Sequence, residues 1–199
     1  PAPIPARQGD DQRECRPLVR GESMETILIV PGLRNSGPSH WQTWFESKLA
    51  GASRVEQADW ERPCLVEWAA RVREAIDSHG GQVWIIAHSF GCLAAVSAGL
   101  VRAERIRAAL LVAPADPARF GGAAELPQER LAFPSLVVAS NNDPWVKPGV
   151  AEHWADVWGS SYQNIGDAGH INVDSGYGPW PQGLGFFREL RHEVLALPV

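Results

Sequence analysis

Ser89, Asp143 and His170 are residue types that together can attack a carbonyl group. A serine hydroxyl is a weak nucleophile, so it needs a base within hydrogen-bond reach, and that base needs an orienting acceptor. An imidazole can take the hydroxyl proton, and a carboxylate can hold the imidazole in the required tautomer. Each of the three residues comes shortly after an expected strand. Together they predict acyl-transfer chemistry.

The clearest local signal is the segment Ala87-His88-Ser89-Phe90-Gly91, which stands between an apolar run and a helical pattern. An abrupt turn from strand to helix strains the corner residue and crowds its flanks, which must therefore be small. Ala87 and Gly91 meet this demand, although Ala stands where the stricter pattern has Gly. Ser89 would then lie at a helix N-terminus, whose partial positive charge favours developing negative charge. By itself the segment is also compatible with a serine that only caps the next helix.

The base and acid candidates follow later expected strands. His170 stands on a glycine-flanked loop after the last run, and Asp143 follows the run before it. Two other carboxylates stay open: Asp116 follows the preceding run, an alternative acid position in some enzymes, and Asp167 lies just before His170. We favour Asp143, then Asp116, and interpret Asp167 as a turn former.

The run from Pro31 to Gly37 follows the first apolar strand and is expected to bind negative charge on a reacting carbonyl oxygen. Such sites use two backbone N–H groups, one from the residue after the nucleophile and one from this loop. Phe90 supplies the first amide, and Leu33 is our candidate for the second. We also expect Asn35 and Trp145 to contact the substrate, since they belong to the loops that flank the site.

Several chemically capable side chains are interpreted as structural. His40 starts the helix after the Pro31 loop and is expected to brace that loop. Cys92 is expected to be a packed, inert thiol, because a serine already occupies the nucleophile position. Trp41, Trp44 and Trp68 lie on helical stripes with other apolar residues, so we expect them to pack in the core.

The elements that must position these residues alternate along the chain. Strands are expected at residues 26–30, 54–58, 82–87, 108–113, 136–140 and 161–165, and helices after Pro38 and at residues 63–78, 91–101, 150–157 and 182–197. This alternation predicts a three-layer α/β/α sandwich with a mainly parallel, six-stranded sheet. Ligands of such sheets bind outside the carboxyl ends of the strands, where the candidate residues stand.

The remaining segments bear on access and on domain organisation. Pro114 to Pro134, between the fourth and fifth strands, is too short for a large cap domain, so we expect an open site and small substrates. Residues 1–23 show no periodicity and are expected to form a loosely held N-terminal extension to a domain at 24–199.

Composition narrows the function classes further. Lys plus Arg is 18 and Asp plus Glu is 23, a net charge of −5, and no basic stripe is present, so nucleic acid is not an expected partner. Charges interrupt the most apolar stretch, from Leu93 to Ala115, so no membrane segment is expected. The three cysteines form no metal-ligand spacing, and reduced thiols favour a cytoplasmic protein.

In its motifs and their order, the chain resembles the small α/β serine hydrolases that include the retinoblastoma-binding-protein type hydrolases and their bacterial esterase relatives. The resemblance extends from Met24 to the C-terminus and rests on Val30-Pro31-Gly32, His40-Trp41, Ala87-His88-Ser89-Phe90-Gly91, Asn142-Asp143-Pro144-Trp145 and Gly169-His170-Ile171-Asn172. The order nucleophile, acid, base matches as well. The resemblance implies an α/β-hydrolase fold, a Ser89, Asp143 and His170 triad acting on small acyl esters, and no cofactor.

The expected function is therefore that of a carboxylesterase that uses a small acyl ester and water. A thioesterase, amidase or aminopeptidase could use the same triad, because triad chemistry does not choose the leaving group. A rival from another class is a protein-interaction protein that keeps the fold with little or no turnover. The matched serine, base and acid argue against this rival, because a binding module has no need of them.

Overall fold

Six parallel strands form one sheet in the computed structural model, which describes residues 25–120 and 126–197. The strands are β1 (Thr26–Val30), β2 (Ala52–Arg54), β3 (Val83–His88), β4 (Ile106–Val112), β5 (Ser135–Ala139) and β6 (Ser161–Asn164), in the order β2-β1-β3-β4-β5-β6. This confirms the predicted six-stranded sheet. Since β2 and β3 lie on opposite sides of β1, the order reverses there, and a crevice opens at the carboxyl ends of β1 and β3.

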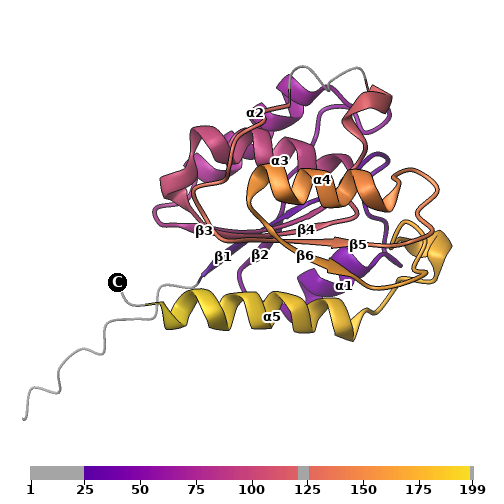
Figure 1. The fold of residues 1–199 in the computed structure, drawn as a ribbon. Helices are drawn as coiled ribbons and strands as arrows, with labels where there is room; N and C mark the ends of the chain where they lie inside the picture. The colour runs from indigo at the N-terminus through magenta and orange to yellow at the C-terminus, as the bar shows by residue number, and fades with distance from the viewer. Residues whose placement is uncertain (1–24, 121–125, 198–199) are drawn as a thin grey trace, which may run out of the picture.

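Helices cover both faces of the sheet, as Figure 1 shows. The helices α1 (Trp41–Lys48) and α5 (Pro181–Ala196) lie on one face, and α2 (Leu65–Asp77), α3 (Phe90–Val101) and α4 (Pro148–Trp158) lie on the other. Short 3₁₀ turns connect other elements: η1 (Ala103–Arg105), η2 (Pro117–Phe120) and η3 (Val173–Ser175). The result is the expected three-layer α/β/α sandwich of the α/β-hydrolase fold.

The apolar runs of the strands follow from burial on both faces. In β1, Leu28 and Val30 pack toward the face of α2, α3 and α4, whereas Ile27 and Ile29 pack toward α1 and α5. A strand covered on both sides has no solvent-facing positions, so its sequence is apolar throughout rather than alternating. Two hydrophobic clusters, one on each side of the sheet, therefore form the core.

The tryptophans expected on helical stripes belong to these clusters. Trp41 and Trp68 are fully buried, and Trp44 is half-buried against the cluster under α1. The rings of Trp41 and Phe45 meet edge to face with their centroids 4.9 Å apart. Aromatic packing of this kind fixes α1 against the sheet and, with it, the loop that precedes the helix.

The second strand is the one element that was misplaced. It was expected at residues 54–58, but it spans Ala52–Arg54. The Ile27 amide donates to the carbonyl of Gly51, whose φ of 80° turns the chain, and pairing with β1 then runs from Ala52 to Arg54. As a short, partly exposed edge strand, β2 has little apolar pattern, so pairing with β1 decides its position rather than its own sequence.

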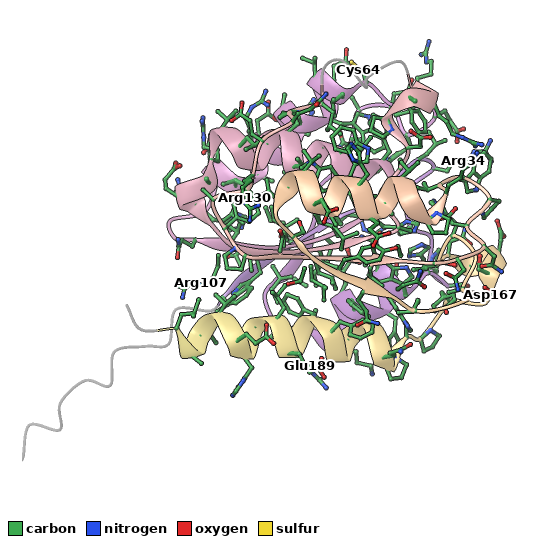
Figure 2. All side chains as sticks on the ribbon, in the orientation of Figure 1. Arg34, Cys64, Arg107, Arg130, Asp167 and Glu189 are labelled. Atoms are coloured by element: carbon green, nitrogen blue, oxygen red, sulfur yellow. The ribbon has the colours of Figure 1, made fainter. Side chains whose placement is uncertain are left out.

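The segment expected to be too short for a cap carries only the turn η2 in its described part, and no cap domain occurs within residues 25–120 and 126–197. Residues 121–125 of this segment, and the expected extension at residues 1–23, lie outside the described residues. Charged side chains such as Arg34 and Glu189 are exposed at the surface of the sandwich (Figure 2). None of the helices in the described ranges is long and apolar enough to cross a membrane.

Candidate active site

Ser89 occupies the corner between β3 and α3. Its backbone has φ 54° and ψ −126°, a conformation that residues with side chains rarely adopt and that persists only when the surroundings impose it. The Ser89 amide donates to the carbonyl of Val112 at 3.0 Å, and its carbonyl accepts from Cys92 and Ala115. Its hydroxyl makes no capping bond with α3, which removes the reading of Ser89 as a simple helix cap.

Glycines allow the first loop to approach this corner. A Cβ atom at Gly91 would lie 2.4 Å from the carbonyl oxygens of Val30 and Pro31. A Cβ atom at Gly32 would lie 2.7 Å from Cβ of Ser89. Both distances are far below van der Waals contact, so only glycine fits at either position without displacing backbone. The small residue expected after the serine is thus explained by its contact with the loop after β1.

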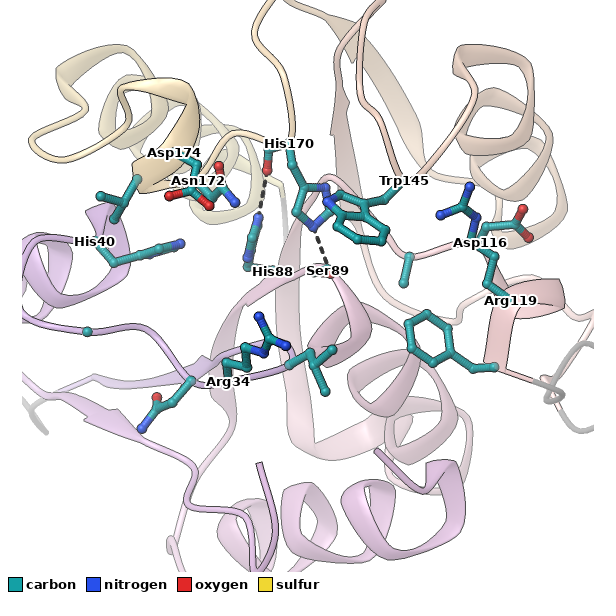
Figure 3. A pocket seen from close by; sticks show the side chains of 16 residues that line it. Arg34, His40, His88, Ser89, Asp116, Arg119, Trp145, His170, Asn172 and Asp174 are labelled. Carbon is teal, nitrogen blue, oxygen red and sulfur yellow. Dashed lines mark hydrogen bonds between the residues drawn. The ribbon is translucent and has the colours of Figure 1, made fainter. Parts of the chain in front are cut away.

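The structure brings Ser89, His170 and Asp143 together from three separate loops. The Ser89 Oγ atom lies 2.9 Å from His170 Nε2, as Figure 3 shows, and His170 Nδ1 lies 2.8 Å from Asp143 Oδ2. A carboxylate can only accept, so Nδ1 carries the imidazole proton and Nε2 is free to accept from the serine hydroxyl. The side chain of Asp143 is 3% exposed, and its other oxygen accepts from the Trp145 amide at 2.8 Å.

The other two carboxylate candidates do not bond to His170. Asp116 lines the cavity beside Ser89, but its Oδ1 atom accepts from the Ala118 amide at 3.0 Å and stabilises the turn η2. Asp167 is exposed at the surface (Figure 2). The geometry therefore favours Asp143 among the three candidates.

One candidate oxyanion donor comes from the loop after β1 and the other from the start of α3. Leu33 lines the cavity that contains Ser89, and Phe90 is the first residue of α3. Neither amide donates a hydrogen bond to another described residue, so both N–H groups remain available to a ligand. The loop turns through Arg34 and Asn35, which have φ values of 66° and 63°, and the Asn35 amide closes the turn on the Gly32 carbonyl at 3.1 Å.

Asn35 was expected to contact the substrate, and it does line the cavity. Its side-chain oxygen, however, accepts from the Ser36 amide at 2.7 Å and from the Arg54 guanidinium at 2.9 Å. Arg54 also donates to the Ser36 carbonyl and to both carboxylate oxygens of Glu46. Sequence reasoning missed Arg54, because nothing local shows that an edge-strand arginine holds the loop after β1.

The acid loop and the base loop are joined by two side chains that sequence reasoning also missed. The side-chain oxygen of Asn142 accepts from the Gly169 amide at 2.7 Å and from the Ser140 hydroxyl at 2.9 Å. The Ser140 hydroxyl in turn accepts from the Ala168 amide at 2.9 Å. These bonds fix the loop of Asp143 against the loop of His170. They therefore hold the carboxylate within hydrogen-bond distance of the imidazole.

A cavity of about 680 Å³ opens in front of Ser89, a size typical of small-molecule sites. Trp145, expected to contact the substrate, lines it and is 57% exposed, with the Arg119 guanidinium 5.6 Å from its ring centre. Figure 3 shows the cavity between the loops that carry Arg34, Arg119 and His170. Within the described parts of the chain, no three His, Cys, Asp or Glu side chains gather as they would around a metal ion.

Two buried histidines lie beside the catalytic candidate His170. The rings of His40 and His88 are 5.1 Å apart, and those of His88 and His170 are 4.9 Å apart. Burial, with smaller contributions from the charges of Arg54 and His170, lowers the pKa of His40 to about 4. Burial likewise holds the pKa of His88 well below its usual range. Both rings are therefore neutral near pH 7 and do not oppose a positive charge on His170.

His40 also braces the first loop, as expected. Its Nδ1 atom accepts from the Gln42 amide at 3.1 Å and so caps α1, and its own amide donates to the Gly37 carbonyl. The thiol of Cys92 is fully buried, and burial raises its pKa, which agrees with an inert packed cysteine.

The lowered pKa of His40 predicts a loss of stability in acid. The folded protein keeps the ring neutral while the unfolded chain protonates it below pH 6.5, so stability falls as the pH drops from 6.5 towards 4. Between pH 7 and pH 5 this amounts to about 2 kcal/mol. The variant His40→Asn keeps an oxygen that can cap α1 but does not titrate. Urea unfolding at both pH values should show a smaller decrease for the variant, and an equal decrease would contradict the prediction.

The parallel sheet with helices on both faces and a strained serine after β3 define an α/β hydrolase. The family described as serine hydrolase matches residues 27–189, and the chain belongs to that family. Membership in it agrees with the resemblance to small serine hydrolases drawn from the motifs. No sequence among the curated proteins matches this chain significantly.

Three solved structures are similar to this chain in fold and, to different degrees, in sequence. A protein described as a YdeN-like hydrolase from Pectobacterium atrosepticum is 36% identical, with a TM-score of 0.81 over 86% of this chain and 92% of that one. The ydeN product of B. subtilis is 19% identical, with a TM-score of 0.71 over 84% of this chain and 99% of that one. Est1E of Butyrivibrio proteoclasticus, solved with ferulic acid, is 12% identical, with a TM-score of 0.64 over 84% of this chain and 90% of that one. This similarity shows a shared fold.

Proposed function

We propose that the protein is a serine carboxylesterase that cleaves small acyl esters through an acyl-enzyme intermediate. The observation that carries the proposal is the continuous hydrogen-bonded row from Ser89 Oγ through His170 to Asp143, which begins at the wall of the cavity. The distance from Ser89 Oγ to His170 Nε2 is 2.9 Å, and that from His170 Nδ1 to Asp143 Oδ2 is 2.8 Å; both are within hydrogen-bond range, as proton transfer requires. The unused amides of Leu33 and Phe90 support the same chemistry.

In the acylation half of the reaction, Ser89 Oγ attacks the ester carbonyl carbon while its proton passes to His170 Nε2. Asp143 holds the imidazole in the Nδ1–H tautomer and stabilises the imidazolium that forms. The Leu33 and Phe90 N–H groups donate to the oxyanion of the tetrahedral intermediate. The intermediate then collapses, the carbon–oxygen bond to the alcohol breaks, and the alcohol leaves with the proton from His170.

Water completes the cycle. It attacks the acyl-serine carbonyl and transfers a proton to His170 Nε2, and the second tetrahedral intermediate forms on the same oxyanion donors. Collapse releases the carboxylic acid and returns the proton to Ser89 Oγ. The compartment that we propose is the cytoplasm, supported by the odd number of cysteines in the sequence, which cannot all pair within the chain.

Substrate size is argued from the cavity. A space of about 680 Å³ without a cap in the described residues suits short acyl groups better than long chains that need a buried tunnel. Hydrolysis of p-nitrophenyl esters should therefore be faster for acetyl and butyryl than for decanoyl or longer groups. A strong preference for long chains would contradict this expectation. Matched thioesters and amides in the same assay test which leaving group the site prefers.

The proposal is tested most directly by covalent labelling. A fluorophosphonate probe should label the wild-type protein on Ser89, and intact-mass and peptide analysis would locate the adduct. If the folded wild type is not labelled and hydrolyses no ester, a non-catalytic interaction protein on the same fold becomes the better explanation.

A further inference from the structure

Two side chains from elsewhere in the fold hold the backbone of the base loop. The Nε2 atom of His88 lies 2.9 Å from the carbonyl oxygen of His170, as Figure 3 shows. The indole Nε1 of Trp41 donates to the carbonyl oxygen of Ile171, the next residue, at 2.8 Å. Both contacts are buried. Consecutive carbonyl groups of the loop are thus held by the end of β3 and the start of α1.

These contacts matter because the loop around His170 has no regular structure of its own. It lies between β6 and η3, and its backbone is left-handed at Gly169, with φ 56°, and at Ile171, with φ 48°. No sheet or helix bonds restrain these carbonyl groups, and a buried carbonyl requires a donor. The direction of the imidazole follows from the backbone that carries it as well as from the bond to Asp143, so the donors to these carbonyl groups help to set where His170 Nε2 points.

His88 also precedes the nucleophile in the chain. It is the last residue of β3, and Ser89 is the next residue. Its contact with the His170 carbonyl therefore links the backbone that carries the hydroxyl directly to the backbone that carries the base. A displacement of about 1 Å between two reacting groups can cost roughly 100-fold in rate, so such a link has a large effect on turnover.

The proton positions of His88 are determined by its partner. A carbonyl oxygen can only accept, so His88 Nε2 carries a hydrogen and donates. The His88 residue is 5% exposed and its ring is neutral, so the Nε2–H group is its one donor. A neutral ring also adds no positive charge next to the imidazolium that forms on His170.

We infer that His88 and Trp41 are positioning residues for the hydrolytic reaction, acting through hydrogen bonds to the His170 and Ile171 carbonyl groups that orient the base toward Ser89. The inference rests on the proposed function. Neither side chain takes part in proton transfer. Their role is to keep the distance between Ser89 Oγ and His170 Nε2 short enough for transfer.

A pair of substitutions of equal length tests His88. In His88→Gln the side-chain amide can still donate near the position of Nε2, whereas in His88→Met the side chain has similar size but no donor. With p-nitrophenyl acetate, we expect the kcat of His88→Met to fall about 30- to 100-fold with KM changed less than about twofold. The Gln variant should recover kcat to within about fivefold of the wild type.

A second matched pair uses two neighbouring tryptophans. Trp41→Phe deletes the N–H that donates to Ile171, while Trp180→Phe makes the same truncation at a buried ring 5.3 Å away whose Nε1 has no partner among the described residues. We expect kcat to fall about tenfold in the first variant and to stay within about twofold in the second. Because these changes keep an aromatic ring, this pair tests the inference even if the His88 variants do not fold.

Near-UV circular dichroism and thermal unfolding would show that each variant is folded. A His88→Met variant with wild-type kcat, a Gln variant as slow as the Met variant, or equal losses in Trp41→Phe and Trp180→Phe would overturn the inference while ester hydrolysis by the wild type stands. A wild-type protein that neither hydrolyses esters nor reacts with a fluorophosphonate would instead overturn the proposed function, and the inference with it.

Discussion

Ser89→Ala is expected to reduce the kcat for a small ester by about 10⁴- to 10⁶-fold, with little change in KM. Only the serine hydroxyl can form the acyl-enzyme, and the variant leaves the His170–Asp143 bond and the Leu33 and Phe90 amides in place. The remaining rate would come from binding and oxyanion stabilisation alone. Stability should be retained, because the hydroxyl makes no capping bond with α3.

The matched control for this experiment is Ser97→Ala, at a serine within α3 that lies outside the cavity. Stopped assays with purified variants, combined with fluorophosphonate labelling, would compare the two. The control should keep wild-type turnover and labelling. A Ser89→Ala protein that keeps more than about one hundredth of the wild-type kcat would show that Ser89 is not the nucleophile.

Asp143→Asn is expected to lower kcat by about 10⁴-fold. In the structure Asp143 Oδ2 accepts from His170 Nδ1 at 2.8 Å, and this acceptor fixes the tautomer that leaves Nε2 free for Ser89. An asparagine amide can donate at the same place, which favours the tautomer with the proton on Nε2 and removes the base. The negative charge that stabilises the imidazolium is lost as well.

Asp116→Asn is the discriminating partner of this variant. Asp116 lines the same cavity, but its carboxylate accepts from the Ala118 amide and an asparagine oxygen can do the same. We expect its kcat to stay within about threefold of the wild type. If Asp116→Asn abolished turnover and Asp143→Asn left it intact, the acid would have to be reassigned to Asp116.

The acid illustrates how far sequence reasoning reached. Asp143 and Asp116 both follow strands of a parallel sheet, and the pattern brings both to the carboxyl edge where the base also lies. The order nucleophile, acid, base fits either carboxylate, because both lie between Ser89 and His170; the position after the next-to-last strand favours Asp143 but does not exclude Asp116. The choice depends on loop conformation, and here the contacts of Ser140 and Asn142 with the base loop bring Asp143 to His170.

The second strand shows a similar limit in the fold. Strands buried on both faces were predictable, because a strand covered by helices on both sides has a continuous apolar sequence. The edge strand β2 is partly exposed, so its residues show little hydrophobic pattern. The prediction therefore placed this strand too late in the chain. Its Arg54 then holds the loop after β1, a role that depends on the correct pairing with β1.

The amino-acid sequence by itself determined the α/β plan and the order of serine, acid and base, because burial periodicity and strand-to-helix turns are local properties of the chain. Only the tertiary structure decided which carboxylate meets His170, that the Asn35 oxygen holds its own loop, and that His88 and Trp41 hold the base loop. These contacts join residues far apart in the chain. Their geometry depends on irregular loops with left-handed backbone, which no local periodicity encodes.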